Sequence, residues 1–377
     1  MNPKLRTRLL VVAIAAAVTA GCAQDDPGQL LQDANAAFAK GEFRTAEIHL
    51  KNLLQEQSEN VDARLLLAKT YAAGRNWPLA EKEFRRALEL GASVDAVGPG
   101  LLEAMFESRD FEGVIEQASK LEPKQPEAQA EAAVRAGRAW LQQGDAERAR
   151  QAFQQALAAR PSLAKAKVGL LTVQAGEGDE ARARALESLN AILADAPDSH
   201  EALMLQSQLR FASGDLEGAR EPLETVVAAS PSDLVARSTL VAIDLQRKDG
   251  KAAKTHLDEL LRRAPGWPVG LTQKAQLDLL DENREAARDS ALEALKAAPD
   301  YLPALTIAGS TSLELGALEQ AEHYARQMIR VAPQAVSGHR LLAATLLRRG
   351  EAGAAMRVVE PLLQLAPDDP QLLVLAG

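Results

Sequence analysis

The sequence predicts an all-α protein, an α-solenoid built from stacked helix-turn-helix repeats. Three observations predict this fold class: a proline that recurs at regular intervals, apolar stripes with helical spacing between these prolines, and a low aromatic content. Only 3% of the 377 residues are aromatic while 47% are hydrophobic, so Ala, Leu and Val must fill the core. Such a core favours closely packed helices over a β-sandwich, whose strands prefer β-branched and aromatic residues.

The prolines set the length of the repeat. The second proline of the series lies 36 residues after the first, and five further intervals are each 34 residues long: Pro161, Pro197, Pro231, Pro265, Pro299, Pro333 and Pro367. A proline cannot continue a helix, so each of these residues marks the end of one helical pair. We number every repeat so that this proline is position 32, and we call its two helices helix A and helix B.

The pattern inside the repeat defines helix B. Position 20 is Ala in nine of ten repeats: Ala46, Ala80, Val114, Ala149, Ala185, Ala219, Ala253, Ala287, Ala321 and Ala355. Positions 20, 24 and 27 are spaced as one apolar stripe of a helix. The small residue at position 20 indicates that two helices cross closely there. Helix A carries its small residue at position 8, and five repeats place Gly at position 15, where the chain must turn between the helices.

The register divides the chain into repeats with two small insertions. Residues 27–367 accommodate ten repeats, with one extra residue expected in the link near residue 129 and two in the turn at 176–179. Residues 368–377 begin an eleventh repeat and stop within its first helix. Because solenoids normally finish with a polar capping helix, we expect the sequence to be a fragment of a longer chain. The natural end of a shorter protein is the alternative.

A 34-residue period of helical pairs with this inner pattern resembles the tetratricopeptide repeat. The resemblance implies a right-handed superhelix whose concave wall is lined mainly by A helices, with positions 2, 5, 9, 12 and 13 facing a groove. An extended peptide or a glycan would bind there, unless this column of polar residues is merely solvated. The candidate binding residues are mostly polar residues at position 9, joined by two Phe at position 12: Asn35, Phe38, Lys69, Glu103, Arg138, Gln208, Phe211 and Gln276.

The N-terminal segment predicts export and lipidation. Residues 1–8 carry three basic residues and no acid, and an apolar run that is too short to span a bilayer follows, which is typical of a signal peptide. The sequence Thr19-Ala20-Gly21-Cys22 then resembles a bacterial lipobox, in which Cys22 is acylated and becomes the mature N-terminus. Residues 1–21 are thus a predicted signal peptide and 22–26 a short tether. A free thiol at an ordinary cleavage site is the alternative for Cys22.

No catalytic constellation is found in the sequence. The five His residues lie in different repeats, no Walker A motif is present, and no acid pair has the spacing of a glycosidase site. A net charge of −9 argues against a nucleic-acid-binding protein, because phosphate binding needs a basic surface. We therefore expect a protein that is not an enzyme, that needs no cofactor or metal, and that binds protein partners.

The first two repeats resemble one family of repeat lipoproteins. Residues 38–43 (FAKGEF), 46–55 (AEIHLKNLLQ) and 80–91 (AEKEFRRALELG) look like the PrsT-type tetratricopeptide lipoproteins of the PEP-CTERM/exosortase system. This resemblance implies a periplasm-facing scaffold in exopolysaccharide export or PEP-CTERM protein sorting. Because Ala23 rather than Asp follows Cys22, it also implies an outer-membrane anchor. An outer-membrane assembly factor (a pilotin or secretin chaperone) and a glycan-binding accessory of a polysaccharide synthase are the alternatives.

Overall fold

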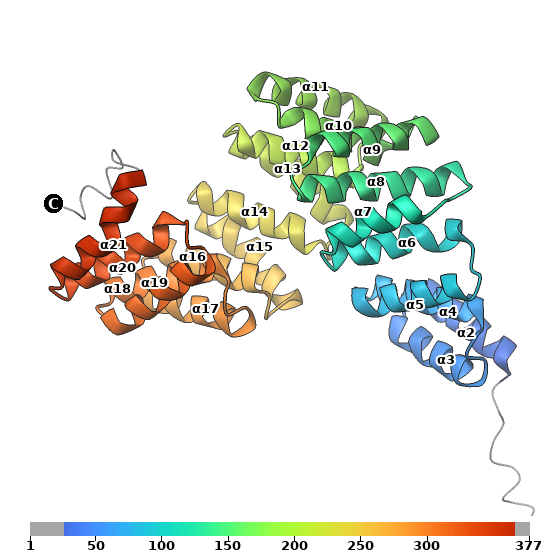
Figure 1. Cartoon of the computed structure of the whole chain (residues 1–377), viewed down its shortest axis with the longest axis horizontal. Helices are drawn as coiled ribbons and strands as arrows, with labels where there is room; N and C mark the ends of the chain where they lie inside the picture. The colour runs from blue at the N-terminus through green and yellow to red at the C-terminus, as the bar shows by residue number, and fades with distance from the viewer. Residues whose placement is uncertain (1–25, 366–377) are drawn as a thin grey trace, which may run out of the picture. The chain divides into compact units, whose positions relative to one another are not determined.

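The computed structural model describes residues 26–365, and every regular element in this range is an α-helix. The helices alternate as A and B helices of ten successive repeats, as Figure 1 shows along the chain. They pack as two units, one up to Ala181 and the other from Arg182 onward, with the division inside one long helix. The all-α prediction is therefore confirmed. Cys22 and residues 366–377, with the predicted eleventh repeat, lie outside the described residues.

Unit 1 contains the first four repeats and the A helix of the fifth. Its helices are α2 (Pro27–Ala39), α3 (Phe43–Glu56), α4 (Val61–Ala73), α5 (Trp77–Glu89), α6 (Val94–Glu107), α7 (Phe111–Lys120), α8 (Pro126–Gln142), α9 (Ala146–Ala159) and α10 (Ala164–Ala175). Each of the first four A helices packs on the B helix of its own repeat, and each B helix packs on the A helix of the next repeat.

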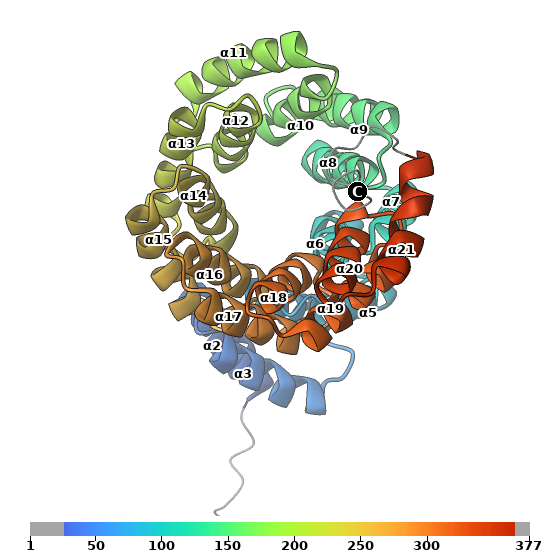
Figure 2. The same ribbon diagram turned by 90° about the vertical axis from the view of Figure 1, so that its left-hand side faces the viewer.

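Unit 2 continues the same alternation after α11 (Asp179–Asp195), which carries the division between the units. Its further helices are α12 (His200–Ala212), α13 (Leu216–Ala229), α14 (Leu234–Gln246), α15 (Gly250–Arg263), α16 (Pro268–Leu280), α17 (Arg284–Ala297), α18 (Leu302–Glu314), α19 (Leu318–Val331), α20 (Val336–Arg348) and α21 (Ala352–Leu365). Within this unit the A helices α12, α14, α16 and α18 form the inner layer of the curve, and α13, α15 and α17 form the outer layer (Figure 2).

The Ala column at position 20 lies where the helices cross. All ten residues of the column are completely buried, and Val114 is buried like the nine Ala residues. The stripe continues one and two turns later through buried residues such as Leu50 and Leu53. Burial of apolar surface stabilises a fold by about 25 cal/mol per Å², so these buried residues stabilise the packed helix pairs of each unit. The register read from the sequence is thus the register of the packed helices.

The turn between helix A and helix B has one geometry throughout. Three residues separate the two helices in every repeat, and nine of the ten repeats place a left-handed residue at position 15, with φ between +57° and +81°. Five of these residues are the predicted Gly. The other four are Arg75, Arg109, Lys248 and Glu282, which adopt a conformation that costs an L-residue about 1–2 kcal/mol. Packing of the two helices imposes the turn even where the residue disfavours it.

The two predicted insertions differ from the structure in their exact places, although the first extra residue does belong to the link between α7 and α8. Gln129 lies inside α8, and the turn at residues 176–178 has the same three residues as the other turns. The first extra residue lies in the link at residues 121–125, which has five residues where the other links between described repeats have four; the short α7 (10 residues) and the long α8 (17 residues) offset each other. The second insertion lengthens α11, which has 17 residues while the other B helices have 10–14. A longer helix accommodates the insertion because each added residue gains a backbone hydrogen bond, which a longer loop would not provide.

Repeat three has Val114 instead of Ala at position 20, and its second helix is short. Helix α7 has only ten residues, and a link of five residues joins it to α8. Asp95 at the start of α6 holds this link, because its Oδ1 accepts hydrogen bonds from the amides of Lys124 (2.7 Å) and Gln125 (3.0 Å). The side chain thus takes over donors that the shortened helix leaves without a helical partner.

Candidate functional site

The exposed side of the A helices is the candidate binding surface. Position 8 is buried against helix B in the repeats that carry the small residue there, while position 9, one residue later, is never buried. Among the predicted residues of unit 1, Asn35 and Lys69 are exposed, and the Asn35 side chain donates to the carbonyl of Leu31 (2.8 Å). The structure therefore places both side chains on the surface of their helices.

Other predicted residues of unit 1 already have intramolecular partners. Glu103 of α6 forms an ion pair with Arg135 of α8. The guanidinium of Arg138 lies over the ring of Phe106, 4.4 Å from its centroid, in a cation–π contact. Phe38 is half-buried and packs against Phe43 at the turn to helix α3 (ring centroids 5.8 Å apart). A ligand on this face would meet a preformed, charge-paired surface.

In unit 2 the predicted residues are more open. Gln208 and Gln276 are exposed at position 9 of α12 and α16, and Phe211 is 37% exposed at position 12. Phe211 lies one helical turn after Gln208 on α12, and Gln276 lies on α16. Gln208 and Gln276 thus belong to the predicted column at position 9, and Phe211 to position 12, of unit 2.

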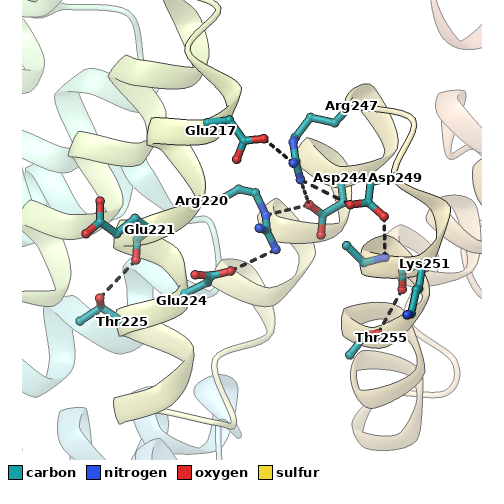
Figure 3. A network of polar contacts seen from close by, with 11 residues as sticks. Glu217, Arg220, Glu221, Glu224, Thr225, Asp244, Arg247, Asp249, Lys251 and Thr255 are labelled. Carbon is teal, nitrogen blue, oxygen red and sulfur yellow. Dashed lines mark hydrogen bonds and ion pairs between the residues drawn. The ribbon is translucent and has the colours of Figure 1, made fainter.

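A buried polar network in unit 2 was not predicted. Asp244 of α14 is completely buried, and its Oδ1 lies 2.8 Å from Nε of Arg220 on α13 and 3.2 Å from Nη1 of Arg247 (Figure 3). Arg220 also reaches Glu224 (3.0 Å), and Arg247 pairs with Glu217. The network therefore ties the B helix of one repeat to the A helix of the next.

Burial within this network shifts two pKa values. Burial raises the pKa of Asp244, although the neighbouring guanidinium groups act to lower it. Burial lowers the pKa of His256 on α15, which lies near Asp244, Arg237 and Arg220. Neither Oδ2 of Asp244 nor Nδ1 of His256 has a hydrogen-bond partner among residues 26–365. A buried polar atom without a hydrogen-bond partner lowers the stability of the folded state, because its desolvation is not compensated.

A signal for this network was present in the sequence. Position 11 is the aromatic position of the repeat, occupied by the buried Tyr71 in the second repeat. Three consecutive repeats place ionisable residues there: Arg210, Asp244 and Asp278. Each is bonded to a B helix, Arg210 to the carbonyl of Gly218, and Asp278 to the hydroxyl of Ser290. Ionisable residues at position 11 of three consecutive repeats thus indicate polar contacts between helix A and helix B.

The described part of the chain contains no cluster of three or more His, Cys, Asp or Glu residues that could hold a metal ion. None of the helices between residues 26 and 365 combines the length and the apolar character of a membrane span. These statements concern the described residues only; Cys22 is not among them.

Comparisons with known proteins agree with the repeat geometry. Two models of the tetratricopeptide repeat match the chain, one over residues 37–97 and 210–277 and the other over residues 111–164 and 173–233. Together the matched segments cover more than half of the 377 residues. Cellulose synthase operon protein C of Xanthomonas axonopodis pv. citri (strain 306) is 29% identical in an alignment of 234 residues, which covers 58% of this chain and only 15% of that protein.

Two solved structures show the same fold. The structural alignment with yeast Tom70 covers 99% of this chain and 92% of the Tom70 chain, with a TM-score of 0.51 and 12% sequence identity. A tetratricopeptide repeat protein from Parabacteroides merdae ATCC 43184 covers 66% of this chain and 97% of its own chain, with a TM-score of 0.50 and 14% identity. The register, the turn geometry and the matched models lead to one conclusion: the chain belongs to the tetratricopeptide-repeat family and has its α-solenoid fold.

Proposed function

We propose that this protein is a non-enzymatic scaffold that binds protein partners in the bacterial cell envelope and serves the export of an exopolysaccharide. The observation that carries the proposal is the similarity to a protein of a cellulose synthase operon, on a fold made of tetratricopeptide repeats. Because the chain spans only 15% of that relative, the similarity concerns the repeats and not the whole relative.

The geometry supports binding rather than catalysis. Within each unit the stacked helix pairs present a face of A helices, and its polar residues at position 9 are distributed over several repeats instead of converging on one point. Such an extended face suits a partner that contacts several repeats at once. Turnover of any substrate by the purified protein would contradict this part of the proposal.

Anchoring at Cys22 would keep the repeats close to the membrane. Only four residues separate Cys22 from Pro27, the first residue of α2. At about 3.3–3.6 Å per residue this tether is shorter than about 20 Å, so the first repeat would lie next to the lipid surface. The role in PEP-CTERM protein sorting is a finer form of the same proposal and is supported by the resemblance of residues 38–91 to the PrsT-type lipoproteins.

A membrane fractionation tests the anchor. We expect Cys22→Ser to abolish acylation and to release the protein from the membrane fraction, because two or more acyl chains provide stable binding. Ala23→Asp serves as the matched variant: it keeps the Cys and should change only the membrane in which the protein is found. Membrane association of Cys22→Ser equal to wild type would refute the lipid anchor.

Crosslinking from intact membranes, combined with a deletion strain, tests the scaffold. We expect crosslinks to subunits of the polysaccharide export or exosortase machinery, and a deletion strain that secretes less polysaccharide. Crosslinks only to secretin subunits would instead support the assembly-factor alternative. Crosslinks only to a polysaccharide synthase, together with direct glycan binding, would support a glycan-binding accessory.

A further inference from the structure

The B helices of the first two repeats, α3 and α5, have a basic outward side. We define the outward face of a B helix as positions 18, 22, 25, 26 and 29 of the repeat, which lie opposite the buried stripe at positions 20, 24 and 27. On α3 and α5 this face contains one acid, Glu89, and five cations that are all at least partly exposed: Arg44, Lys51, Lys82, Arg85 and Arg86. Five cations against one acid give the face a net charge of +4.

The other B helices lack such a face. At the same positions α7, α9, α11, α13 and α17 carry more acids than cations, α15 and α21 carry equal numbers, and α19 carries one extra cation. The outward face of α13 is the most acidic, with Glu217, Glu221 and Glu224 and no cation. Since the whole chain has a net charge of −9, the basic face is a local property of α3 and α5.

Pairing within the helices does not cancel this charge. Among residues 26–365, Arg44 and Lys82 form no side-chain hydrogen bond or ion pair. Lys51 and Arg85 pair with acids at position 21 of their own helices (2.7 and 2.8 Å between nitrogen and oxygen). These two acids are only 20% and 25% exposed, whereas their basic partners are 54% and 42% exposed, so the cations lie on the outside. Even with both acids counted, the five cations face only three acids.

An exposed apolar side chain lies between the cations of α3. Ile48 at position 22 is 50% exposed, and it follows Arg44 by four residues and precedes Lys51 by three, so the three side chains share one side of the helix. Basic residues around an exposed aliphatic side chain are typical of helices that lie in a membrane surface. An acidic protein surface would pair with the cations but would leave Ile48 without an apolar contact, so the composition of the face favours lipid.

The proposed lipid anchor would bring this face to a membrane. Helix α3 packs on α2, and only four residues separate Pro27, the first residue of α2, from Cys22. An acylated Cys22 would therefore hold the first repeat within about 20 Å of the lipid surface. Anionic phospholipids attract basic side chains within about one Debye length, roughly 10 Å, and the tether allows such an approach.

We propose that the outward face of α3 and α5 binds the surface of an anionic phospholipid bilayer. Its cations contact the phosphate groups, and Ile48 enters the boundary of the acyl chains. The inference rests on the proposed function and deepens it, because it names the surface on which the anchored repeats lie. The A helices α2 and α4 pack on the other side of α3 and α5, so this orientation leaves them open to protein partners.

Vesicle flotation of an acyl-free chain tests the proposal. The protein is the mature chain, residues 22–377 with Cys22→Ser, which keeps every described helix but cannot be acylated. The probes are vesicles of phosphatidylethanolamine with about one quarter phosphatidylglycerol, and vesicles of phosphatidylcholine alone. We expect the anionic vesicles to be bound at least about tenfold more tightly than the neutral ones, and this binding to weaken at least about tenfold between about 0.05 M and about 0.3 M salt.

Two double variants of this chain locate the binding. Arg44→Glu with Lys82→Glu reverses the two unpaired cations, at positions 18 and 22, and we expect it to raise the Kd at least about tenfold. Lys251→Glu with Arg357→Glu is the matched control, because it reverses exposed cations at the same two positions of α15 and α21 and changes the net charge equally. The control should raise the Kd less than about threefold, and circular dichroism should show that both variants are folded.

Two single variants test the apolar contact. Ile48→Ser should raise the Kd at least about threefold at low and at high salt, because salt does not screen the burial of an apolar side chain. Met356→Ser on α21 is the control, since Met356 is 40% exposed and belongs to another B helix. An unchanged Kd for Ile48→Ser would contradict the insertion of this side chain.

Several outcomes would overturn the inference. These are equal binding of neutral and anionic vesicles, equal loss of binding in the control pair, and no binding of either kind of vesicle. Self-association of the chain that Arg44→Glu with Lys82→Glu abolishes, without vesicle binding, would assign the face to a second copy. If the vesicles are bound as expected but the deletion strain secretes normal polysaccharide, the proposed role in export fails and the inference stands. If the deletion strain is defective and no vesicle is bound, the inference fails and the proposed role stands.

Discussion

Replacing Gly169 by Ala tests how closely the helices of unit 1 are packed. The ring of Phe153 on α9 is completely buried between two glycines, Gly137 on α8 and Gly169 on α10. A Cβ atom at Gly169 would lie 2.4 Å from Cε1 of Phe153, and one at Gly137 would lie 2.7 Å from the same atom. Both distances are far below van der Waals contact, so the ring or a helix would have to move.

The expected magnitude is the difference of two effects. Overpacking of a buried site costs about 1–3 kcal/mol, and a clash of 2.4 Å with a ring enclosed on two sides belongs in the upper half of that range. Ala in a helix interior gains about 1 kcal/mol over Gly. We therefore expect Gly169→Ala to destabilise the repeat by about 1–2 kcal/mol. In a folding unit of 150–250 residues this lowers the melting temperature by about 2–8 °C.

The assay is a double-mutant cycle with Phe153→Leu. Leu lacks the ring atoms that the new Cβ would meet, so Gly169→Ala in this background should be neutral or stabilising through its helix propensity. Thermal unfolding reports the net effect, and hydrogen exchange of peptides from α8–α10 reports the local one, because solenoids unfold in parts. Gly353→Ala in α21 is the control, since a Cβ there meets nothing closer than 3.9 Å.

Two results would refute this reasoning. A higher melting temperature for Gly169→Ala alone would mean that the ring moves without cost and that the packing is loose. The same loss of stability in the wild-type and the Phe153→Leu backgrounds would mean that the cost does not come from the contact with the ring.

Two further predictions concern unit 2. Pro222 has no N–H to bond the carbonyl of Gly218, and Nη1 of Arg210 donates to that oxygen instead (2.8 Å). We expect Arg210→Met to lower the free energy of unfolding, measured with denaturant, by about 1–3 kcal/mol. In a Pro222→Ala background the loss should be much smaller, because the backbone amide at position 222 can then donate to the carbonyl of Gly218. Equal losses in the two backgrounds would contradict this reasoning. Burial lowers the pKa of His256 in the folded protein. Below about pH 6.5 the unfolded chain therefore binds the proton more tightly than the folded chain does, and the folded state becomes less stable as the pH decreases. His256→Gln should lose less melting temperature than wild type between pH 7.5 and pH 5.5, and an identical loss in both proteins would show that another group controls the pH dependence.

Most of the fold could be predicted from the sequence because the repeat is a local code. Each helix pair repeats the same spacing of Ala, Leu and Pro, and each repeat packs only on its neighbours. One correct register therefore predicts the buried seam of the whole array. The complete burial of Ala219 and of the other nine residues at position 20 confirms this register in all ten repeats.

The places where prediction failed depend on compensation between neighbouring helices. The extra residue predicted near residue 129 lies in the link at residues 121–125, and a longer α8 offsets a shorter α7, a balance that no single window of sequence reveals. Similarly, Lys248 occupies a left-handed turn that its side chain disfavours, because the packing of α14 on α15 holds the turn closed. Sequence patterns report average preferences, and these residues depart from the average.

The candidate site was only partly accessible to sequence reasoning. The pattern placed Phe211 and Gln276 on the exposed side of their helices, where the structure has them. It did not show that Glu103 is paired with Arg135 or that Asp244 is buried among guanidinium groups, because the partners lie on other helices. The binding roles of all the predicted site residues stay predictions.

By itself the sequence determined the helical repeat, its register and the buried Ala seam, because periodic apolar residues can be buried in only one way when identical pairs stack. It also predicts acylation of Cys22 from a segment that resembles a lipobox, and this stays a prediction. Only the tertiary structure decided which polar side chains satisfy one another and which stay open to a partner. The physical reason is that charge pairing and exposure depend on atoms that neighbouring helices bring together, such as Arg220 and Asp244, and a repeat pattern does not encode those contacts.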